Sequence, residues 1–369
     1  MGKGKILVVF GTRPEAIKMC PVVEELKKRE GLVCRLCVTA QHRELMDGIL
    51  SRFGIAPDYD LDLMREGQDL FDLTERVLEG IRPILAREAP DLVLVHGDTT
   101  TAFGTALAAF YRGIPVGHVE AGLRTYDLSA PFPEEWNRRA IGILAKYHFA
   151  PTVRAQETLL REGISPERIL VTGNTGIDAL RKTVRENYTN PDLEWAKGSR
   201  LLLLTAHRRE NQGEPMRRAF RGIRRVLEEF PNVKLLYPIH PSPAVRSVAE
   251  EFSGEERARL IAPMGVIDFH NALARCHLVL TDSGGIQEEA PALGKPVLIL
   301  RSRTERQEGL EAGVSRLIGT GEGSVYRGIR ELLENDALYS VMSRAQSPYG
   351  DGHAAKRIAD TLEKYFCCF

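Results

Sequence analysis

The chain has 369 residues, and its 50 Lys plus Arg balance 50 Asp plus Glu, giving a formal net charge of zero. At about 150 residues per domain, this length predicts two substantial domains. Hydrophobic residues make up 43% and charged residues 27%, which excludes a disordered or fibrous chain. Balanced charge creates no overall field toward nucleic acid or an anionic membrane, so we expect neither as a partner.

No apolar run approaches the ~18 residues that span a bilayer, and the run 6–10 is too short for a signal-peptide core. We therefore expect a cytoplasmic protein. Six cysteines are too few and too scattered for a disulfide scaffold. Cys34 and Cys37 have the spacing of half a zinc site, but no second pair exists, so we interpret them as strand residues and expect no metal.

Short apolar runs alternate with longer segments of helical periodicity along the chain. The expected strands are 5–10, 32–39, 91–96, 115–119, 200–204, 233–239, 278–281 and 296–300. These runs are rich in Val, Ile and Leu without polar alternates, as in parallel strands that helices bury on both faces. The pattern predicts an α/β protein with doubly wound parallel sheets.

Two segments of similar pattern indicate two similar domains. In 92–116 and again in 278–297, a strand leads through an acid-plus-small turn and a helix to Gly-x-Pro-Val. Residues 186–199 are polar and lack apolar periodicity, which predicts a connection near there. We expect an N-terminal domain over 1–185, a C-terminal domain over 186–353, and a last helix within 354–369 that packs back onto the N-terminal domain.

The first expected strand ends in a turn suited to phosphate, Gly11-Thr-Arg-Pro-Glu15, with Lys18 about one turn further on. A helix N-terminus offers free N–H groups, and Arg13 adds a bidentate donor. This segment alone is equally compatible with a second interpretation, in which Arg13 and Glu15 form an ion pair on the surface and bind no ligand. Neither Gly-x-Gly-x-x-Gly nor a Walker A pattern occurs there, so we expect no dinucleotide cofactor.

A second such turn, Asp282-Ser-Gly-Gly285, has small residues that let backbone amides approach a pyrophosphate. The helix expected over 286–290 places Glu288 and Glu289 in its first turn. A carboxylate there suits the helix dipole, but it would repel a phosphate. One of the two is therefore expected to accept from ribose hydroxyls, and we favour Glu289.

Acidic residues gather after neighbouring strands of the first half. Asp98 follows the run 91–96, Glu120 follows the run 115–119, and Glu134 stands in Pro-Glu-Glu further on. Ligands bind beyond the carboxyl ends of parallel strands, so we expect the three acids near one site. A plain alternative for Asp98 is that it caps the following helix.

Two histidines end strands of the second half. His207 stands beside Arg208 and Arg209, and His240 follows the run 233–239. We expect both imidazoles at the same sheet edge, with His207 the stronger functional candidate because of its cationic neighbours.

These motifs resemble the non-hydrolysing UDP-N-acetylglucosamine 2-epimerase family over nearly the whole chain. Between the end segments 10–19 and 348–352, six motifs occur in the family's order, at 95–100, 117–124, 133–138, 207–211, 281–290 and 304–306. The resemblance implies two facing Rossmann-like domains of the glycosyltransferase B (GT-B) architecture. It also implies reversible conversion of UDP-GlcNAc to UDP-ManNAc without a cofactor, and we expect a homodimer.

The resemblance implies roles for single residues at matching positions. The implied catalytic residues are Asp98, Glu120, Glu134 and His207. The implied substrate and UDP contacts are Arg13, Lys18, His240, Ser283, Gly284, Gly285, Glu289 and Arg306. Members of the family also bind a second UDP-GlcNAc as an activator, and the segments that look like that site contain Gln41, His42, Gln68, Arg208 and His240.

The C2 hydrogen of a 2-acetamido sugar is not next to a carbonyl, so the C1–O bond must loosen before a carboxylate can remove it. Loss of UDP and the C2 proton gives a 2-acetamidoglucal, and re-addition with protonation of the opposite face inverts C2. We assign proton transfer to Glu120 and Asp98, and charge stabilisation at UDP to His207 with Arg13. At least one acid should have a raised pKa.

Other functions stay open on the sequence. A hydrolysing epimerase would release free ManNAc, and an inverting glycosyltransferase would need an acceptor cleft and one general base. A regulator that only binds nucleotide sugars would not need the three acids and His207 together. Trp136 stands where the family usually has a small residue, so a modified UDP-aminosugar is also open as the substrate.

Overall fold

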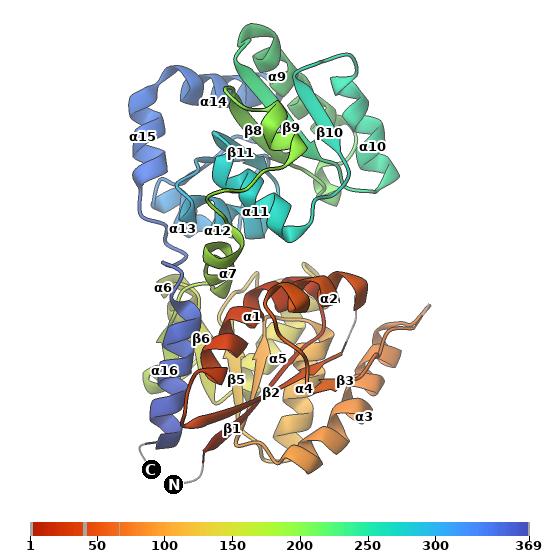
Figure 1. Ribbon diagram of the computed structural model, residues 1–369, viewed down its shortest axis with the longest axis vertical. Coiled ribbons are helices and arrows are strands. Elements are labelled where there is room, and N and C mark those ends of the chain that lie inside the picture. The colour runs from red at the N-terminus through yellow and green to blue at the C-terminus, as the bar shows by residue number, and fades with distance from the viewer. Residues whose placement is uncertain (1–2, 40–42, 66, 368–369) are drawn as a thin grey trace. The chain divides into compact units, whose positions relative to one another are not determined.

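The computed structural model describes residues 3–39, 43–65 and 67–367. The chain forms two compact units, one of residues 1–179 with 349–369 and one of residues 180–348. Each unit contains one sheet of parallel strands with helices packed on it (Figure 1). The predicted α/β class with parallel sheets is confirmed. Among the described residues, no helix is long and apolar enough to cross a bilayer.

The first unit has a seven-stranded sheet in the order β3-β2-β1-β4-β5-β6-β7. Its strands are β1 (Gly4–Phe10), β2 (Leu32–Val38), β3 (Tyr59–Asp60), β4 (Leu92–His96), β5 (Val116–Val119), β6 (Tyr147–Ala150) and β7 (Ile169–Val171). Its helices are α1 (Arg13–Lys27), α2 (Arg43–Arg52), α3 (Leu70–Glu88), α4 (Thr100–Tyr111), α5 (Glu134–Leu144), α6 (Val153–Arg161) and α16 (Ala354–Cys367), and α7 (Thr175–Thr183) begins in it.

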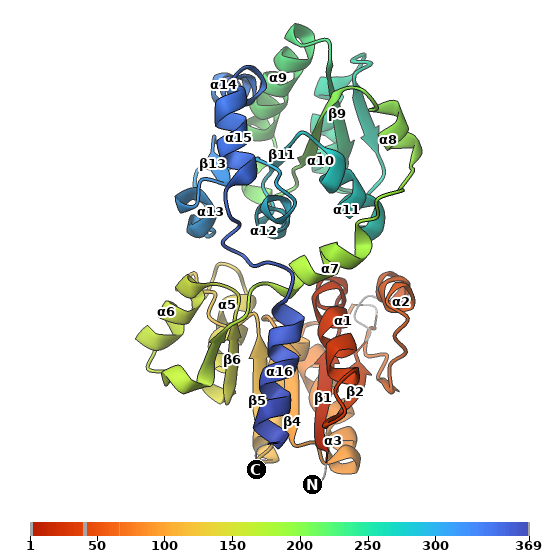
Figure 2. The ribbon, with the colours of Figure 1, turned by 60° about the vertical axis from the view of Figure 1, so that its left-hand side comes forward.

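Helices bury both faces of the central strands in the first unit. Leu7, Val9, Val93 and Val95 of β1 and β4 share a core with α3, α4 and α5. On the other face α1 and α16 pack against β1 and against each other, as Figure 2 shows. The start of α16 is fixed by Asp178, whose carboxylate accepts from the N–H groups of Ala354 and Ala355 at 3.2 and 2.9 Å.

The second unit has a six-stranded sheet in the order β10-β9-β8-β11-β12-β13. Its strands are β8 (Arg200–Thr205), β9 (Val233–Pro238), β10 (Ala258–Ile261), β11 (Leu278–Thr281), β12 (Val297–Ile299) and β13 (Ser315–Leu317). Its helices are α8 (Pro191–Trp195), α9 (Glu214–Glu229), α10 (Pro243–Ala249), α11 (Val266–Arg275), α12 (Gly284–Ala292), α13 (Gln307–Glu311), α14 (Glu322–Glu334) and α15 (Asp336–Arg344).

Successive residues of β8 face two different cores. Leu202 and Leu204 pack with α9, α10 and α14, whereas Leu201 and Leu203 pack with α8, α11 and α12. Because both faces are dry, the strand needs apolar residues at every position. This burial explains the continuous apolar runs in the sequence.

Every strand expected from the sequence is present, with each end within one residue of its expected position. The strands β3, β6, β7, β10 and β13 were not expected, because runs of two to four residues are too short to show periodicity. Within the polar segment 186–199, the short helix α8 contributes Leu193 and Ala196 to the core of the second unit.

Candidate active site

The turn after β1 holds the N-terminus of α1 in a tightly packed corner. A Cβ on Gly11 would lie 2.0 Å from Thr39 Oγ1, so this position has no room for a side chain. Thr12 caps α1, and the buried Glu15 carboxylate accepts from Thr12 N at 2.8 Å and from Thr99 Oγ1 at 2.8 Å. Burial raises the pKa of Glu15 above its usual value. Glu15 therefore fixes this turn and is not the partner of Arg13 in a surface pair.

Glu120, directly after β5, forms a close ion pair with Lys18 of α1. Its Oε2 also lies 3.6 Å from Nε2 of His96, the last residue of β4. Glu120 has a φ of 65°, in the left-handed region that non-glycine residues rarely adopt and that often marks functional sites. Burial raises the pKa of Glu120, but the charges of Lys18 and His96 outweigh burial and hold this pKa well below its usual range. Glu120 is therefore ionised at neutral pH.

Two buried histidines support the ends of β4 and β5. His96 is 4% exposed, and its ring nitrogens have no hydrogen-bond partner among the described residues. His118 Nε2 lies 2.7 Å from the carbonyl oxygen of Gly97, and burial lowers the pKa of His118 to about 3. Sequence reasoning did not single out His96, although its place two residues before Asp98 was a usable signal.

Asp98 is held by the first turns of α5. Its carboxylate pairs with Arg138, and Asn137 Nδ2 donates to its backbone oxygen at 2.9 Å. The cap of α4 is Thr99, whose Oγ1 accepts from Ala102 N at 3.0 Å. Asp98 is therefore not the helix cap, and its half-buried side chain is held at the sheet edge by a cation.

Glu134 is the first residue of α5, four positions before Arg138 and so on the same helical face. The next residue, Glu135, is fully buried and accepts from the N–H groups of Thr125 and Tyr126 at 3.0 Å each. Glu135 thus fixes the loop that follows Glu120, a role the sequence did not indicate.

Trp136, the next residue of α5, exposes 53% of its surface.

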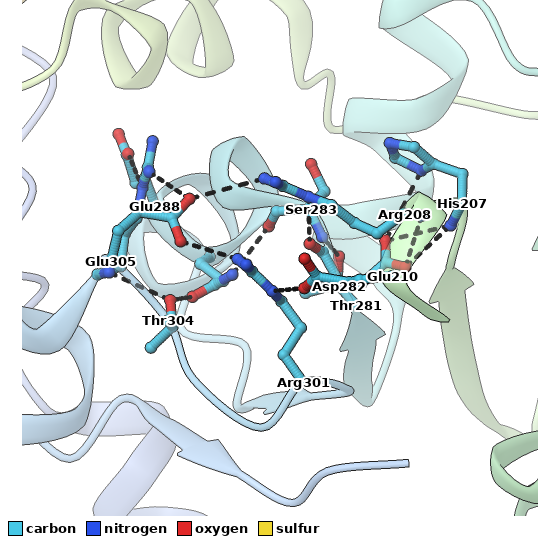
Figure 3. A network of polar contacts seen from close by, with 12 residues as sticks. His207, Arg208, Glu210, Thr281, Asp282, Ser283, Glu288, Arg301, Thr304 and Glu305 are labelled. Atoms are coloured by element: carbon cyan, nitrogen blue, oxygen red, sulfur yellow. Dashed lines mark hydrogen bonds and ion pairs between the residues drawn. The ribbon is translucent and has the colours of Figure 1, made fainter. Parts of the chain in front are cut away.

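Asp282 organises the corresponding edge of the second unit (Figure 3). This fully buried carboxylate follows β11 and accepts from His207 N at 3.0 Å, Arg208 N at 2.9 Å and Asn211 Nδ2 at 3.2 Å. It therefore fixes the turn that follows β8. The sequence indicated Asp282 only as part of its own turn, because its partners lie more than seventy residues away.

The rings of His207 and His240 stack, with centroids 5.4 Å apart and an interplanar angle of 15°. Burial lowers the pKa of His207, and the charges of His240 and Arg208 add to this effect while Asp282 opposes it. The neutral imidazole is therefore favoured at neutral pH. His207 still exposes 42% of its side chain, which leaves it accessible to a ligand.

The helix α12 begins at Gly284, two residues earlier than expected, so Glu288 and Glu289 lie in its second turn and not in its first. Ser283 is the N-cap residue, and its backbone N donates to Thr281 Oγ1 at 2.9 Å. Its hydroxyl makes no capping hydrogen bond to the helix. The Arg306 guanidinium covers the turn, since a Cβ on Gly284 would lie 2.9 Å from its Cζ.

A chain of alternating charges extends from Arg306. Its Nε donates to Glu288 at 2.8 Å and one terminal nitrogen donates to Glu305 at 2.8 Å. Arg301 in turn donates to Glu305 at 2.8 Å and to Glu210 at 2.7 Å, as Figure 3 shows. Burial raises the pKa of Glu305, but the two arginines outweigh it and lower this pKa to about 2. Because Glu288 binds Arg306, Glu289 is the neighbouring carboxylate that this network leaves to a ligand.

Arg13 is half-buried at the start of α1. Gln68 Oε1 accepts from Arg65 N at 2.9 Å within its own loop, and Arg208 lies 3.6 Å from Glu305. Gln41 and His42 lie outside the described residues.

Cys34 and Cys37 are strand residues of β2, and burial raises the pKa of both thiols to about 12. In the described part of the chain, no group of three or more His, Cys, Asp or Glu side chains is placed to hold a metal ion.

Residues 24–363 match the family described as UDP-N-acetylglucosamine 2-epimerase. The chain belongs to this family. It is 52% identical over 363 residues to the UDP-N-acetylglucosamine 2-epimerase of Bacillus subtilis, covering 98% of this chain and 96% of that protein. The crystal structure described as a UDP-N-acetylglucosamine 2-epimerase from Listeria monocytogenes superimposes on this chain with a TM-score of 0.95 at 49% sequence identity. The match covers 100% of this chain and 98% of the Listeria chain.

The UDP-GlcNAc 2-epimerase of Neisseria meningitidis, solved bound to UDP-GlcNAc, has a TM-score of 0.89 at 43% identity, covering 98% of this chain and 100% of that one. These full-length matches confirm the family resemblance and the GT-B-like two-domain fold.

Proposed function

We propose that this protein interconverts UDP-GlcNAc and UDP-ManNAc by epimerisation at C2. The observation that carries the proposal is that Asp98 and Glu120 stand at the ends of the adjacent strands β4 and β5, each held by its own cation. Two separately held carboxylates suit a reaction in which one group removes the C2 proton and another returns it. We infer that UDP-GlcNAc is the substrate because the chain belongs to the UDP-N-acetylglucosamine 2-epimerase family.

In the first half of the reaction, Glu120 accepts the C2 proton as the C1–O bond breaks, giving UDP and a 2-acetamidoglucal. The low pKa of Glu120 keeps the group ionised before the reaction starts, so the carboxylate is ready to accept a proton. Once Glu120 is neutral, its attraction to Lys18 weakens, and the ammonium group stabilises negative charge that develops on the substrate. Asp98 takes a proton from solvent and delivers it to the opposite face of C2 while UDP adds back to C1, and Glu120 then releases the original C2 proton to solvent. Glu134 takes part in this proton exchange.

The second unit binds the nucleotide. Ser283, Gly284 and Gly285 supply the helix N-terminus for the pyrophosphate, and Arg306 supplies a cation beside it. Glu289 accepts from the ribose, and His240 stacks behind His207. His207 donates a hydrogen bond to the departing UDP as a neutral imidazole, with Arg13 adding positive charge.

A second UDP-GlcNAc acts as an activator through Arg208, Gln68 and His240, together with Gln41 and His42. The support is the family membership and the place of Arg208, whose Nε donates to Asp282 O at 3.2 Å beside His207. A ligand that binds to Arg208 would therefore act directly on Asp282 and, through it, on the turn that carries His207.

The protein forms a homodimer through α3, α4 and α5. These helices pack side by side and expose Phe71, Phe110, Tyr111 and Ile143 by 56 to 85% of their surfaces. A cavity of about 320 Å³ between α3 and α4 is lined by Leu78, Leu85, Ala108 and Tyr111, flanked by Arg82 and Arg112. Exposed apolar side chains on neighbouring helices suit an interface between two copies of the chain. Light scattering should give twice the chain mass, and Tyr111→Asp should give the monomer.

Product analysis tests the proposed reaction. Purified protein incubated with UDP-GlcNAc should produce UDP-ManNAc, followed by NMR, and the same mixture should form from UDP-ManNAc with UDP-GlcNAc present. Free ManNAc with stoichiometric UDP would assign a hydrolysing epimerase instead. Absence of both products, with a modified UDP-aminosugar reacting, would change the substrate.

A further inference from the structure

A buried histidine of α11 stands behind the Glu289 carboxylate. His270 is 2% exposed, and its Nε2 lies 3.7 Å from Glu289 Oε2. The other ring nitrogen, Nδ1, lies 2.7 Å from Oγ1 of Thr183, the last residue of α7. The imidazole therefore links the end of α7 to the carboxylate that we propose for the ribose.

The carboxylate determines where the imidazole carries its proton. A lone pair on Nε2 would face a negative oxygen, so the proton is favoured on Nε2. In the neutral ring, Nδ1 then accepts from the Thr183 hydroxyl, as the separation of 2.7 Å permits. The contact of that hydroxyl with Leu180 O is longer, at 3.3 Å. The Nε2–H group is thereby turned toward Glu289.

The next residue, Asn271, fixes the backbone on which His270 stands. Asn271 is fully buried, and its Nδ2 donates to Thr183 O at 2.8 Å and to Ile267 O at 2.9 Å. Its Oδ1 accepts from Arg185 N at 2.9 Å. These buried hydrogen bonds hold the backbone of α11 at His270, and the contact of Nδ1 with Thr183 holds the ring itself.

The His270 ring faces Oε2 of Glu289 at 3.7 Å, and the other oxygen, Oε1, points to the turn before α12. Oε1 lies 4.0 Å from the position that a Cβ on Gly285 would take, and so at the turn that we propose for the pyrophosphate. A carboxylate that is held in one orientation presents this oxygen without a further entropy cost when the ligand binds.

We propose that His270 is a positioning residue that orients Glu289 for recognition of the ribose, and so makes the site reject nucleotides that lack a ribose hydroxyl. The inference rests on the proposed function, because it takes Glu289 as the ribose acceptor. A fixed polar group discriminates strongly against a missing hydroxyl, because the group is then left unpaired. A mobile carboxylate would turn away and discriminate less.

Calorimetry with UDP, 2′-deoxy-UDP and 3′-deoxy-UDP tests the proposal on the full chain. The wild type should bind UDP at least about tenfold more tightly than one of the deoxy analogues, a difference of about 1.4 kcal/mol. His270→Asn retains a partner for Thr183 but is too short to reach Glu289, so this preference should fall by about tenfold. His270→Gln places a donor near the Nε2 position and should retain most of the preference.

Glu289→Ala, which removes the acceptor altogether, separates the failure of this inference from the failure of the proposed function. If Glu289→Ala abolishes the preference but H270N keeps it, His270 does not position Glu289 and the inference is wrong. If Glu289→Ala leaves the preference intact, the ribose role of Glu289 is wrong and the inference falls with it. If H270N does not fold, Thr183→Val serves as the second variant. It removes the hydroxyl that contacts His270 Nδ1, and it should also weaken the preference for UDP over its deoxy analogues.

Discussion

The Lys18 ammonium of α1 lies directly against the Glu120 carboxylate at the end of β5, and the two side chains are 18% and 15% exposed. Removing solvent from both groups strengthens their attraction and costs each of them hydration. The balance favours charge, since the pKa of Glu120 lies well below its usual range in spite of its burial. The pair therefore keeps Glu120, the base of the proposed mechanism, ionised before substrate arrives.

Replacing Lys18 by Met should move the acidic limb of activity to higher pH. The variant removes a charge that lowers the Glu120 pKa and leaves the burial that raises it. Glu120 then ionises at a higher pH, and the acidic limb of the kcat/KM profile should rise by about one pH unit or more. Lys18→Arg keeps the charge and should leave the limb near its original position. An unmoved limb in the Met variant would argue against Glu120 as the base.

Replacing Asp282 by Asn should weaken UDP binding. The Asn oxygen can replace only one of the two carboxylate oxygens. Its NH2 group then faces the N–H of His207, and the negative charge is lost, so the turn after β8 is held less firmly. We expect the Kd for UDP to rise roughly tenfold to a hundredfold and the melting temperature to fall. Asp192→Asn breaks only the partly exposed pair with Arg259 and is the matched control in the same unit. Equal UDP affinity in the two variants would contradict this role of Asp282.

Acid should destabilise the first unit through His148 of β6. His148 is 0% exposed, and burial, helped by the charge of Arg168, lowers its pKa to about 4. The unfolded chain, with a usual pKa of about 6.5, therefore binds more protons, and stability falls as pH drops from 7 toward 4. The cost at pH 5 is about 2 kcal/mol, obtained by integrating between these two pKa values.

Denaturant unfolding of His148→Leu at pH 5 and pH 8 measures this contribution. The variant should lose less stability between the two pH values than the wild type does. Phe149→Leu perturbs packing on the same strand without removing a titrating group, and its pH dependence should match the wild type. A His148→Leu protein with the full wild-type pH dependence would show that His148 does not bind the protons.

Activity should depend sigmoidally on UDP-GlcNAc if Arg208 belongs to an activator site. UDP-ManNAc alone should react slowly, and a small amount of UDP-GlcNAc should accelerate it, as steady-state rates in both directions would show. Arg208→Ala should weaken this stimulation. Hyperbolic kinetics in both directions without stimulation would remove the activator proposal and leave the catalytic one standing.

The sequence predicted the long strands well. Each of them is buried on both faces of its sheet and therefore consists of a continuous run of apolar residues. It missed strands such as β13 (Ser315–Leu317), where three residues with an Arg at the centre carry no pattern. Glu15 could have been recognised, since Thr12 and Glu15 have the spacing of a capping box. The role of Asp282 in holding the turn after β8 could not have been recognised. Its hydrogen-bond partners lie more than seventy residues away, so no local sequence pattern indicates them.

Deuterium incorporation at C2 tests the central claim most directly. In the proposed mechanism, elimination moves the C2 proton to Glu120, and re-addition delivers a proton that Asp98 has taken from solvent. Asp98 is half-buried, so water can reach it. UDP-ManNAc formed from UDP-GlcNAc in deuterium oxide should therefore carry deuterium at C2, observed by NMR. Asp98→Asn and Glu120→Gln should each lower turnover by roughly a hundredfold or more while UDP still binds. Product that is fully protiated at C2, or a double variant that turns over normally, would contradict the mechanism and the assignment of both acids.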